Sequence, residues 1–261
     1  MKTALVTGAS FGIGETFAEE LAARNTNLVI VARSKDKLDQ LATQLQQQHN
    51  IKVEVIAQDL TQPNATQTVF DTITQKGIVI DLLINNAGFG DYGAFIERPL
   101  EKQVAMIQLN NIALVELTHL FLPGMKQRGS GGIINVSSIA GFQPLPYLSI
   151  YAATKAFVLS FTEAIWAENK DSGVHITALC PGPTESQFFE RAEFPNNFAG
   201  AKSNYASAEK VVKDALQALE KNQSNLVTGG VANQFIVNLP RLFPREMIVS
   251  IVEKQFRQGQ S

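Results

Sequence analysis

Residues 2 to 14 read Lys2-Thr3-Ala4-Leu5-Val6-Thr7-Gly8-Ala9-Ser10-Phe11-Gly12-Ile13-Gly14, a short apolar run followed by a glycine-rich turn. Apolar residues then recur at helical spacing between Glu15 and Arg24, which predicts a strand, a tight turn and a helix in that order. The free N–H groups and the dipole of a helix N-terminus favour an anion. Glycine lets the backbone come close to a phosphate. The predicted phosphate-binding turn consists of Gly8, Ser10, Phe11, Gly12, Ile13 and Gly14.

The glycines of this turn have the spacing G-x-x-x-G-x-G rather than the more common G-x-G-x-x-G of dinucleotide-binding turns. The turn also lacks the Gly-Lys-Ser/Thr that completes a P-loop. By itself, a glycine-rich turn after a strand can be purely structural. Its place at the first strand–helix junction favours a dinucleotide site.

The end of the next predicted strand, Asn27–Ala32, bears on which dinucleotide binds. An acidic residue at this point would bond the ribose hydroxyls of NAD, whereas an arginine nearby accommodates the 2′-phosphate of NADP. Ala32 stands where the acid would be expected and Arg33 follows it, so the pattern favours NADP(H) over NAD(H). Arg33 as an ordinary charge beside a helix remains the alternative, because the glycine turn contains no second basic residue.

A second motif, Tyr151-Ala-Ala-Thr-Lys155, lies far along the chain, with Ser138 thirteen residues before it. Side chains four residues apart share one face of a helix. A tyrosine hydroxyl has a pKa of about 10, and a nearby ammonium lowers that pKa toward the range useful for acid–base chemistry. Ser138 could then hold a carbonyl oxygen while Tyr151 gives it a proton. The spacing predicts carbonyl–alcohol chemistry, although the motif alone could be a half-buried tyrosine beside a surface lysine.

Strand-like and helix-like segments alternate along the whole chain. Strands are expected at Lys2–Thr7, Asn27–Ala32, Lys52–Gln58, Asp81–Asn85, Gly132–Val136, Val174–Cys180 and Asn225–Val227. Helices are expected at Glu15–Arg24, Lys35–Gln48, Asn64–Lys76, Leu100–Gln127, Ser149–Asp171 and Ala208–Lys221. Regular β-α-β alternation predicts a parallel sheet with helices on both faces. We therefore expect an α/β fold, a single Rossmann-like doubly wound domain of about seven strands spanning residues 1–261.

The composition disfavours several other classes of protein. The 261 residues carry 22 basic and 24 acidic side chains, interspersed, and this net charge of −2 offers no surface for nucleic acid. Cys180, the one cysteine, lies in an apolar strand pattern that indicates packing. His49, His119 and His175 are scattered, so no metal site is expected. No apolar run approaches the length of a membrane-spanning helix and no signal peptide is recognisable, so we expect a cytoplasmic enzyme.

In combination, these motifs resemble the short-chain dehydrogenase/reductase family, in its compact one-domain branch. The resemblance runs from Thr3 to about Thr228. It depends on the order and spacing of Thr7-Gly-Ala-Ser-Phe-Gly-Ile-Gly14, Asp59-Leu60, Asn85-Asn-Ala-Gly88, Asn110, Ile134-Asn-Val-Ser-Ser138, Tyr151-x-x-x-Lys155 and Pro181-Gly-Pro-Thr184. The resemblance implies an NAD(P)-dependent enzyme acting on CH–OH groups, and a homodimer or homotetramer formed through the predicted helices Leu100–Gln127 and Ser149–Asp171.

The resemblance also implies catalytic roles for the matching residues. Tyr151 would be the general acid in carbonyl reduction and the base in alcohol oxidation. Lys155 would bond the nicotinamide ribose as well as lower the tyrosine pKa, and Ser138 would hold the substrate oxygen. Asn110, chosen over its neighbour Asn111 from the family spacing, would hold a water that links Lys155 to solvent.

The rest of the cofactor site is implied in the same way. Asp59 would bond the adenine amino group, and Leu60 would line the adenine slot. The turn beside the adenosine ribose, which would also fix the central sheet, consists of Asn85, Asn86, Ala87 and Gly88. The loop that seats the nicotinamide carboxamide consists of Pro181, Gly182, Thr184 and Ser186. Taken singly, Asp59 could be a helix-start acid and Asn110 a buried amide, but the ordered set makes these readings improbable.

Two further regions bear on the substrate. The stretch 187–205 resembles the family's mobile substrate loop and contains Phe188, Phe189, Phe194 and Phe198. The opposite wall of the pocket is expected to contain Phe142, Pro144, Leu145, Pro146 and Tyr147. Unless several of these side chains are merely core, they indicate a hydrophobic ketone or a 3-oxoacyl substrate.

The apolar segment 232–257, helical in spacing over Met247–Phe256, could close the pocket, form a subunit contact or rest on a membrane. Closure of the pocket or a subunit contact is favoured, because the segment has only a weak version of the basic face that a membrane-surface helix needs.

The leading hypothesis is an NADP(H)-dependent carbonyl reductase. The alternative is a non-catalytic NADP(H)-binding sensor or scaffold protein on the same fold. The joint presence of Asn110, Ser138, Tyr151 and Lys155 argues against that alternative, because a scaffold needs none of them together. A sugar-nucleotide epimerase or dehydratase on a related fold would want a different glycine spacing.

Overall fold

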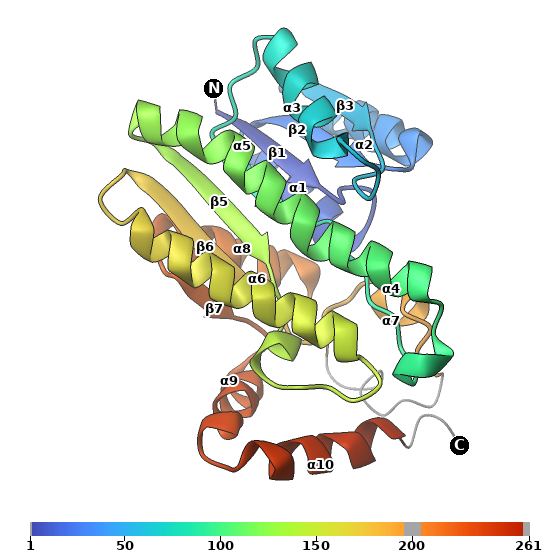
Figure 1. The fold of residues 1–261 in the computed structure, drawn as a ribbon. Helices are drawn as coiled ribbons and strands as arrows, with labels where there is room; N and C mark the ends of the chain where they lie inside the picture. The colour runs from blue at the N-terminus through green and yellow to red at the C-terminus, as the bar shows by residue number, and fades with distance from the viewer. Residues whose placement is uncertain (1, 196–204, 258–261) are drawn as a thin grey trace.

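A computed structural model describes residues 2–195 and 205–257 of the chain. Within these residues, seven strands form one sheet in the order β3-β2-β1-β4-β5-β6-β7 (Figure 1). The strands are β1 (Thr3–Thr7), β2 (Asn27–Ala32), β3 (Val53–Ala57), β4 (Leu82–Asn85), β5 (Gly131–Val136), β6 (Val174–Cys180) and β7 (Asn225–Val227). Every neighbouring pair is parallel. The predicted α/β fold with a doubly wound parallel sheet is confirmed.

The strand order reverses beside β1, which pairs with β2 on one side and with β4 on the other. Leu5 of β1 lies opposite Val29 on β2 and Leu83 on β4. All three side chains are fully buried, as expected for a parallel sheet that is covered on both faces. In sheets of this kind, ligands bind beyond the carboxyl ends of the strands, at the point where the order reverses.

Three helices cover one face of the sheet (Figure 1). They are α1 (Gly12–Ala23), α2 (Lys35–Gln48) and α8 (Ala208–Glu220). Phe17 of α1, Leu45 of α2 and Val212 of α8 belong to one buried cluster with strand residues such as Val6 and Ile30. The apolar stripes read from the sequence are the faces that pack here.

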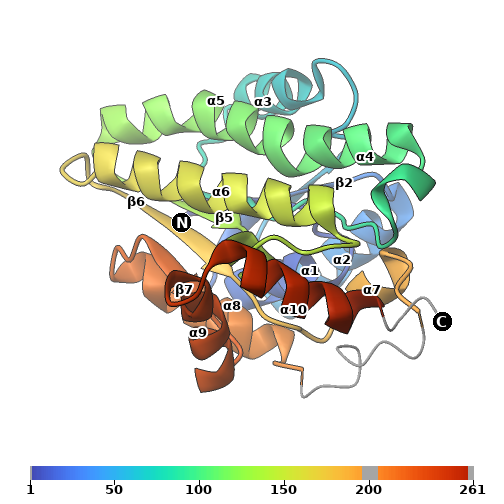
Figure 2. The same ribbon diagram turned by 60° about the horizontal axis from the view of Figure 1, so that its bottom comes forward.

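The other face is covered by helices that lie along the sheet in both views (Figures 1 and 2). They are α3 (Ala65–Gln75), α5 (Ala113–Arg128) and α6 (Ser149–Glu168). The helix α4 (Leu100–Ile107) precedes α5 and contacts α6. Val69 of α3, Leu117 and Phe121 of α5 and Ile165 of α6 pack on strand residues such as Leu5.

One prediction about the long helix is wrong. A π-helical turn, Gln108–Ile112, joins α4 to α5, so that Leu100–Arg128 is continuous and is long and apolar enough, by length and composition, to cross a membrane. The sequence analysis expected no such segment. Leu117 and Met125 pack in the core against the sheet, which accounts for the apolar composition of α5.

Shorter elements lie at the carboxyl end of the sheet. They are α7 (Phe188–Arg191), α9 (Val231–Asn238), a 3₁₀ turn (Leu239–Arg241) and α10 (Arg245–Arg257). In Figure 2, α10 crosses in front of the sheet below α6, and α7 lies near its far end. Tyr92 contacts both the segment after α7 and the end of α10. Its ring centroid is 4.8 Å from that of Phe194, and its hydroxyl donates to the Phe256 carbonyl.

Most helix and strand ends agree with the sequence within three residues, the usual uncertainty of such boundaries. One difference concerns α1, which begins at Gly12 rather than Glu15 because glycines form its first turn. The segment 187–205, expected from the resemblance to be a mobile substrate loop, contains the four-residue helical turn α7 in its described part. Phe198 lies outside the described residues.

Candidate active site

The glycine turn is held in a backbone shape that other residues would strain. Gly8 and Gly12 have φ angles of +68° and +59°, in the left-handed region. A Cβ on Gly14 would stand 2.3 Å from the Gly8 carbonyl oxygen and 2.4 Å from Asn86 Nδ2. The first turn of α1 therefore lies directly against the end of β1, with its N–H groups at the carboxyl edge of the sheet.

The turn after β4 is bonded to the same edge. Asn86 Nδ2 donates to the Thr7 carbonyl at 3.0 Å, and the backbone N–H groups of Asn86 and Ala87 both donate to Thr7 Oγ1 at 3.0 Å. Asn85 lies deeper, where its Nδ2 donates to Thr118 Oγ1 and to Asn135 Oδ1. These bonds join β1, β4, β5 and α5, which is the sheet-fixing role expected for this turn.

The far end of the predicted nucleotide site lies beyond β2 and β3. Leu60 is buried, and Arg33 is exposed at the end of β2. Burial alone would raise the pKa of Asp59, but hydrogen bonds from the Thr61 N–H and hydroxyl, together with the charge of Arg33, hold it below the usual range. Both bonds from Thr61 end on Asp59 Oδ1, and the Gln62 side chain is a further hydrogen-bond donor to this carboxylate.

Ser138, Tyr151 and Lys155 lie together where β5 ends and α6 begins. The Ser138 side chain hydrogen-bonds the Tyr151 phenol and accepts the Ala140 N–H at 3.1 Å. Lys155 Nζ donates to the Val136 carbonyl at 2.8 Å and lies 5.7 Å from the centroid of the Tyr151 ring. The structure thus brings the three predicted catalytic side chains to one place.

The acidity of Tyr151 differs from the expectation. Burial raises the pKa of Tyr151 to about 12, and the hydrogen bond with Ser138 only partly opposes this. Burial likewise lowers the pKa of Lys155 to about 8. The prediction that Lys155 lowers the tyrosine pKa is wrong for this arrangement, because the ammonium bonds the Val136 carbonyl and both groups are removed from water.

Asn110 lies in the π turn, a feature that often marks functional sites in helices. Its Nδ2 donates to the Phe89 carbonyl and to Thr154 Oγ1, both at 3.0 Å, and its Oδ1 accepts the Phe89 N–H at 3.1 Å. The neighbouring Asn111 donates to the Thr154 carbonyl at 3.0 Å. The Asn110 side chain therefore positions the turn after β4 and α6, with both Nδ2 hydrogens already used.

The loop after β6 connects the catalytic residues with the glycine turn. The Pro181 carbonyl accepts from Ser138 Oγ at 3.4 Å, and Thr184 Oγ1 donates to the Gly182 carbonyl at 2.9 Å. At the far end of the loop, Ser186 Cβ lies 3.2 Å from the point where a Cβ on Gly12 would stand. The loop therefore spans the distance from the predicted substrate oxygen to the predicted phosphate site.

Apolar side chains pack around Tyr151. The Phe188 ring lies 5.1 Å from the Tyr151 ring, and it passes over Gly90, where a Cβ would come within 2.7 Å of it. Ile248 and Val252 of α10 belong to the same buried cluster. This face of α10 therefore packs in the apolar cluster that contains Tyr151. The predicted wall residues Leu145 and Tyr147 are also in the cluster.

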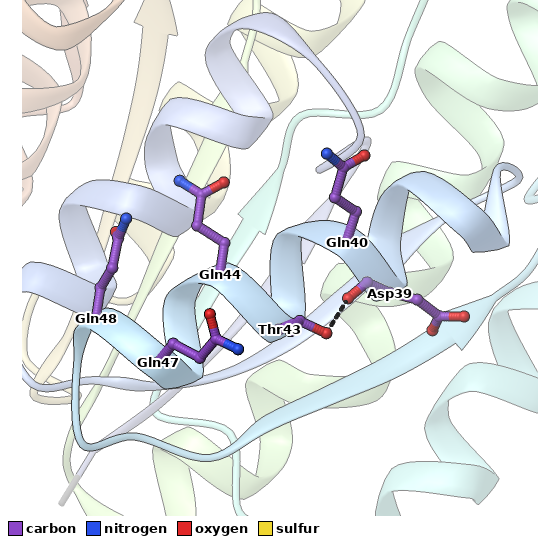
Figure 3. Close-up of a pocket in the computed structure, with 6 residues that line it drawn as sticks. All are labelled: Asp39, Gln40, Thr43, Gln44, Gln47 and Gln48. Atoms are coloured by element: carbon purple, nitrogen blue, oxygen red, sulfur yellow. Dashed lines mark hydrogen bonds between the residues drawn. The ribbon is translucent and has the colours of Figure 1, made fainter.

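Cys180 and a hollow on the surface of α2 lie outside the group of predicted site residues. Cys180 is fully buried in β6, and burial raises the pKa of its thiol to about 12, so its interpretation as a packing residue is confirmed. A hollow on α2 (Figure 3) is lined by Asp39, Gln40, Thr43, Gln44, Gln47 and Gln48. Its lining comes from the polar outer side of one helix, as expected for a glutamine-rich helix end, and none of the predicted site residues takes part in it.

Two further side chains position the catalytic residues but were not predicted from the sequence. Thr154 accepts from Asn110 and donates to the Tyr151 carbonyl at 2.7 Å, and Ser137 Oγ donates to the Lys155 carbonyl at 2.7 Å. Both belong to the motifs that were read, as the Thr before Lys155 and the first serine of the pair.

The model of the short chain dehydrogenase family matches residues 2–195. The chain belongs to this family. Across an alignment of 257 residues it is 32% identical to the very-long-chain 3-oxoacyl-CoA reductase of Mus musculus, covering 95% of this chain and 78% of that protein. The protein of the same name from Anas platyrhynchos is 38% identical over 186 residues. That match covers 68% of this chain and 58% of the duck protein, so the chain spans little more than half of that relative.

Solved structures agree with this membership. A short-chain dehydrogenase from Sphingobium yanoikuyae, solved in complex with NADPH, superposes with a TM-score of 0.82. It is 33% identical, and the superposition covers 96% of each chain. This agreement extends over the short elements at the carboxyl edge as well as over the sheet.

Proposed function

We propose that this member of the family is an NADP(H)-dependent oxidoreductase that reduces a hydrophobic ketone or 3-oxoacyl group to the alcohol, or runs the reverse reaction. The observation that carries the proposal is the hydrogen-bonded pair Ser138 and Tyr151, with Lys155 beside them, at the end of a loop that leads to the glycine turn. A hydroxyl pair of this kind binds one oxygen atom and exchanges one proton with it.

The residues present fit a nicotinamide dinucleotide. Gly8 and Gly12 have left-handed backbone angles, and side chains at Gly8, Gly12 and Gly88 would meet neighbouring groups within 3.2 Å, so these turns can pack closely only without side chains. Phosphates would bind the N-terminus of α1, the adenosine would lie toward Asp59 and Leu60, and Lys155 would bond the nicotinamide ribose.

When bound, the nicotinamide supplies or accepts the hydride. Tyr151 keeps its proton at neutral pH, because burial raises its pKa to about 12, so it can act as the acid toward a carbonyl oxygen held by Ser138. Negative charge that develops on that oxygen would be stabilised by the Lys155 ammonium. In the oxidative direction the phenol must first lose its proton, so a high tyrosine pKa favours reduction near neutral pH.

Cofactor preference and substrate class depend on separate observations. Arg33 at the end of β2, with no acid there, supports NADP(H), and the Sphingobium relative is in complex with NADPH. The apolar cluster around Tyr151, which includes Phe188 and Ile248, supports a hydrophobic substrate. The mouse relative is named for a very-long-chain 3-oxoacyl-CoA substrate.

The test is a panel of ketones, aldehydes and 3-oxoacyl thioesters with NADPH and with NADH, measured by the loss of reduced-nicotinamide absorbance. The wild type should turn over apolar ketones best with NADPH, and Tyr151→Phe should lose activity by about 10²-fold or more while still binding NADPH. Thr43→Val, which removes an exposed hydroxyl on α2, is the control and should keep wild-type activity. If Tyr151→Phe performed the cellular role of the protein as well as the wild type does, that result would instead support the sensor or scaffold alternative.

We also propose a homo-oligomer in the cytoplasm. The outer sides of α4, α5 and α6 expose Leu100, Val104, Ile112 and Phe157, an apolar surface suited to a second copy. Sedimentation velocity should give a dimer or tetramer at micromolar concentration, and Phe157→Glu should shift it toward monomer. Fractionation of the tagged protein tests the location, and recovery in the membrane pellet would contradict it.

A further inference from the structure

An arginine of the short helix α7 lies flat on the phosphate-binding turn. The Arg191 guanidinium carbon is 3.7 Å from the centroid of the Phe11 ring. Its Nε and Nη2 both donate to Gln187 Oε1, at 3.1 and 3.0 Å, which fixes the plane of the guanidinium. Two of its five N–H groups are used in this way, and the others have no partner among the described residues.

This guanidinium lies where the turn itself has no positive charge. Residues 8–15 contain no lysine or arginine, and the first turn of α1 carries the acidic Glu15. Within the described ranges 2–195 and 205–257, no carboxylate forms an ion pair with Arg191. By contrast, Arg98, which lies just before α4, forms ion pairs with Asp91 and Glu193. Arg191 therefore brings an uncompensated cation to an anion site.

The position of α7 is fixed from two further directions. Phe188, one turn before Arg191, packs on the Tyr151 ring at 5.1 Å. Glu193, just after the helix, forms ion pairs with Arg98 and Lys102. Because Phe188 packs on Tyr151, the contact of Arg191 with Phe11 joins the substrate side of the site to its nucleotide side.

We propose that Arg191 is a cofactor-binding residue, whose guanidinium, stacked on Phe11, binds a phosphate group of the dinucleotide. Arginine binds phosphate through parallel N–H donors, and stacking on an aromatic ring holds it in a fixed plane. The phosphate is either the bridging pyrophosphate or the 2′-phosphate of NADP. The inference rests on the proposed function, since it needs a dinucleotide in the site.

The experiment is isothermal titration calorimetry of NADP⁺ and NAD⁺ into the wild type and into Arg191→Gln, at one fixed salt concentration. The dissociation constant should rise by about tenfold in Arg191→Gln, the effect of one charge-assisted hydrogen bond at an exposed group. Arg191→Lys, which keeps the charge without the planar fork, should fall between the two. Arg24→Gln, at the opposite end of α1, removes the same charge as a control and should bind like wild type.

Weaker binding of both dinucleotides by Arg191→Gln supports contact with the pyrophosphate, and weaker binding of NADP⁺ alone supports contact with the 2′-phosphate. Unchanged binding of both, or an equal loss in Arg24→Gln, overturns the inference and leaves the proposed function standing. A wild-type chain that binds neither dinucleotide overturns both. Thermal melting without nucleotide, matched to wild type, excludes misfolding as the cause of a loss.

Discussion

Replacing Lys155 by methionine is predicted to stabilise the folded protein at neutral pH while it removes turnover. The Lys155 side chain is 6% exposed, and burial lowers its pKa from 10.5 to about 8. Both the folded and the unfolded chain carry the charge near pH 7, but only the folded chain holds it away from water. The charge is therefore kept at the expense of folding stability, as is common at active sites.

The magnitude follows from the pKa difference. A lysine pKa lowered from 10.5 to about 8 corresponds to about 3 kcal/mol of destabilisation at neutral pH. Methionine fills a similar volume without a charge, but it leaves the Val136 carbonyl without the Lys155 donor, a loss of about 1 kcal/mol. The expected net gain in the free energy of unfolding of Lys155→Met is about 2 kcal/mol near pH 7.

The pH dependence of this gain distinguishes the charge from packing. Between pH 8 and 10.5 the unfolded chain binds more protons at residue 155 than the folded chain does, so the stability of the wild type rises with pH through this window. Lys155→Met lacks that rise. At about pH 10 the charge penalty falls below about 1 kcal/mol, and the two proteins should have nearly equal stability.

Urea unfolding followed by far-ultraviolet circular dichroism measures the difference, at about pH 7 and about pH 10. These values stay below the folded-state pKa of Tyr151, about 12, so that phenol does not titrate in the folded chain. Lys170→Met, an exposed lysine at the end of α6, is the control and should show no pH-dependent difference. If Lys155→Met were less stable than wild type by the same amount at both pH values, the reasoning from buried charge would be refuted.

Three further predictions concern the pocket, the turn and the sheet. Phe188→Ala should raise the kcat/KM ratio of bulky to small ketones by about tenfold, because it removes the ring above Tyr151, whereas the exposed Phe157→Ala should leave the ratio unchanged. Gly14→Ala should lower the free energy of unfolding by about 1–3 kcal/mol, because the new Cβ would stand 2.3 Å from a backbone atom. Gly124→Ala, whose Cβ would meet only the end of the Arg128 side chain, should leave it unchanged, and urea unfolding of both variants is the measurement. Asn135→Ala removes hydrogen bonds to Asn85 and Thr162 and should cost about 2–5 kcal/mol in the same assay, and a loss no larger than that of the exposed Asn50→Ala would contradict the buried network.

The spacing of apolar residues and the positions of turn residues in the sequence predicted most of the fold. The strands Asn27–Ala32, Val174–Cys180 and Asn225–Val227 have the bounds that their apolar runs predicted, because buried parallel strands are apolar along their whole length. The start of α1 was placed three residues late, since glycines contribute nothing to an apolar stripe. The glycine spacing identified the turn, but only the coordinates show that helix and turn overlap.

Insertions within a helix leave little trace in composition. The π turn Gln108–Ile112 adds one residue to a helical turn, and the only sign of it is the pair Asn110 and Asn111 in an apolar run. The same turn brings both amides to Thr154. The helix α7 is four residues long, too short for an apolar period, so the contact of Arg191 with Phe11 could not be read from either segment alone.

The spacing of Tyr151 and Lys155 in the sequence did not predict the direction of the Tyr151 pKa shift. The i, i+4 spacing placed Tyr151 and Lys155 on one helix face, and an ammonium near a phenol favours the phenolate in water. Here both groups are buried, and burial disfavours the charged form of each, so the tyrosine pKa rises while the lysine pKa falls. Spacing determines which groups are neighbours, whereas burial determines which protonation state each neighbour prefers. A phenol that keeps its proton and an ammonium that is costly to bury are together suited to giving a proton to a carbonyl oxygen, which is why we propose reduction as the favoured direction near neutral pH.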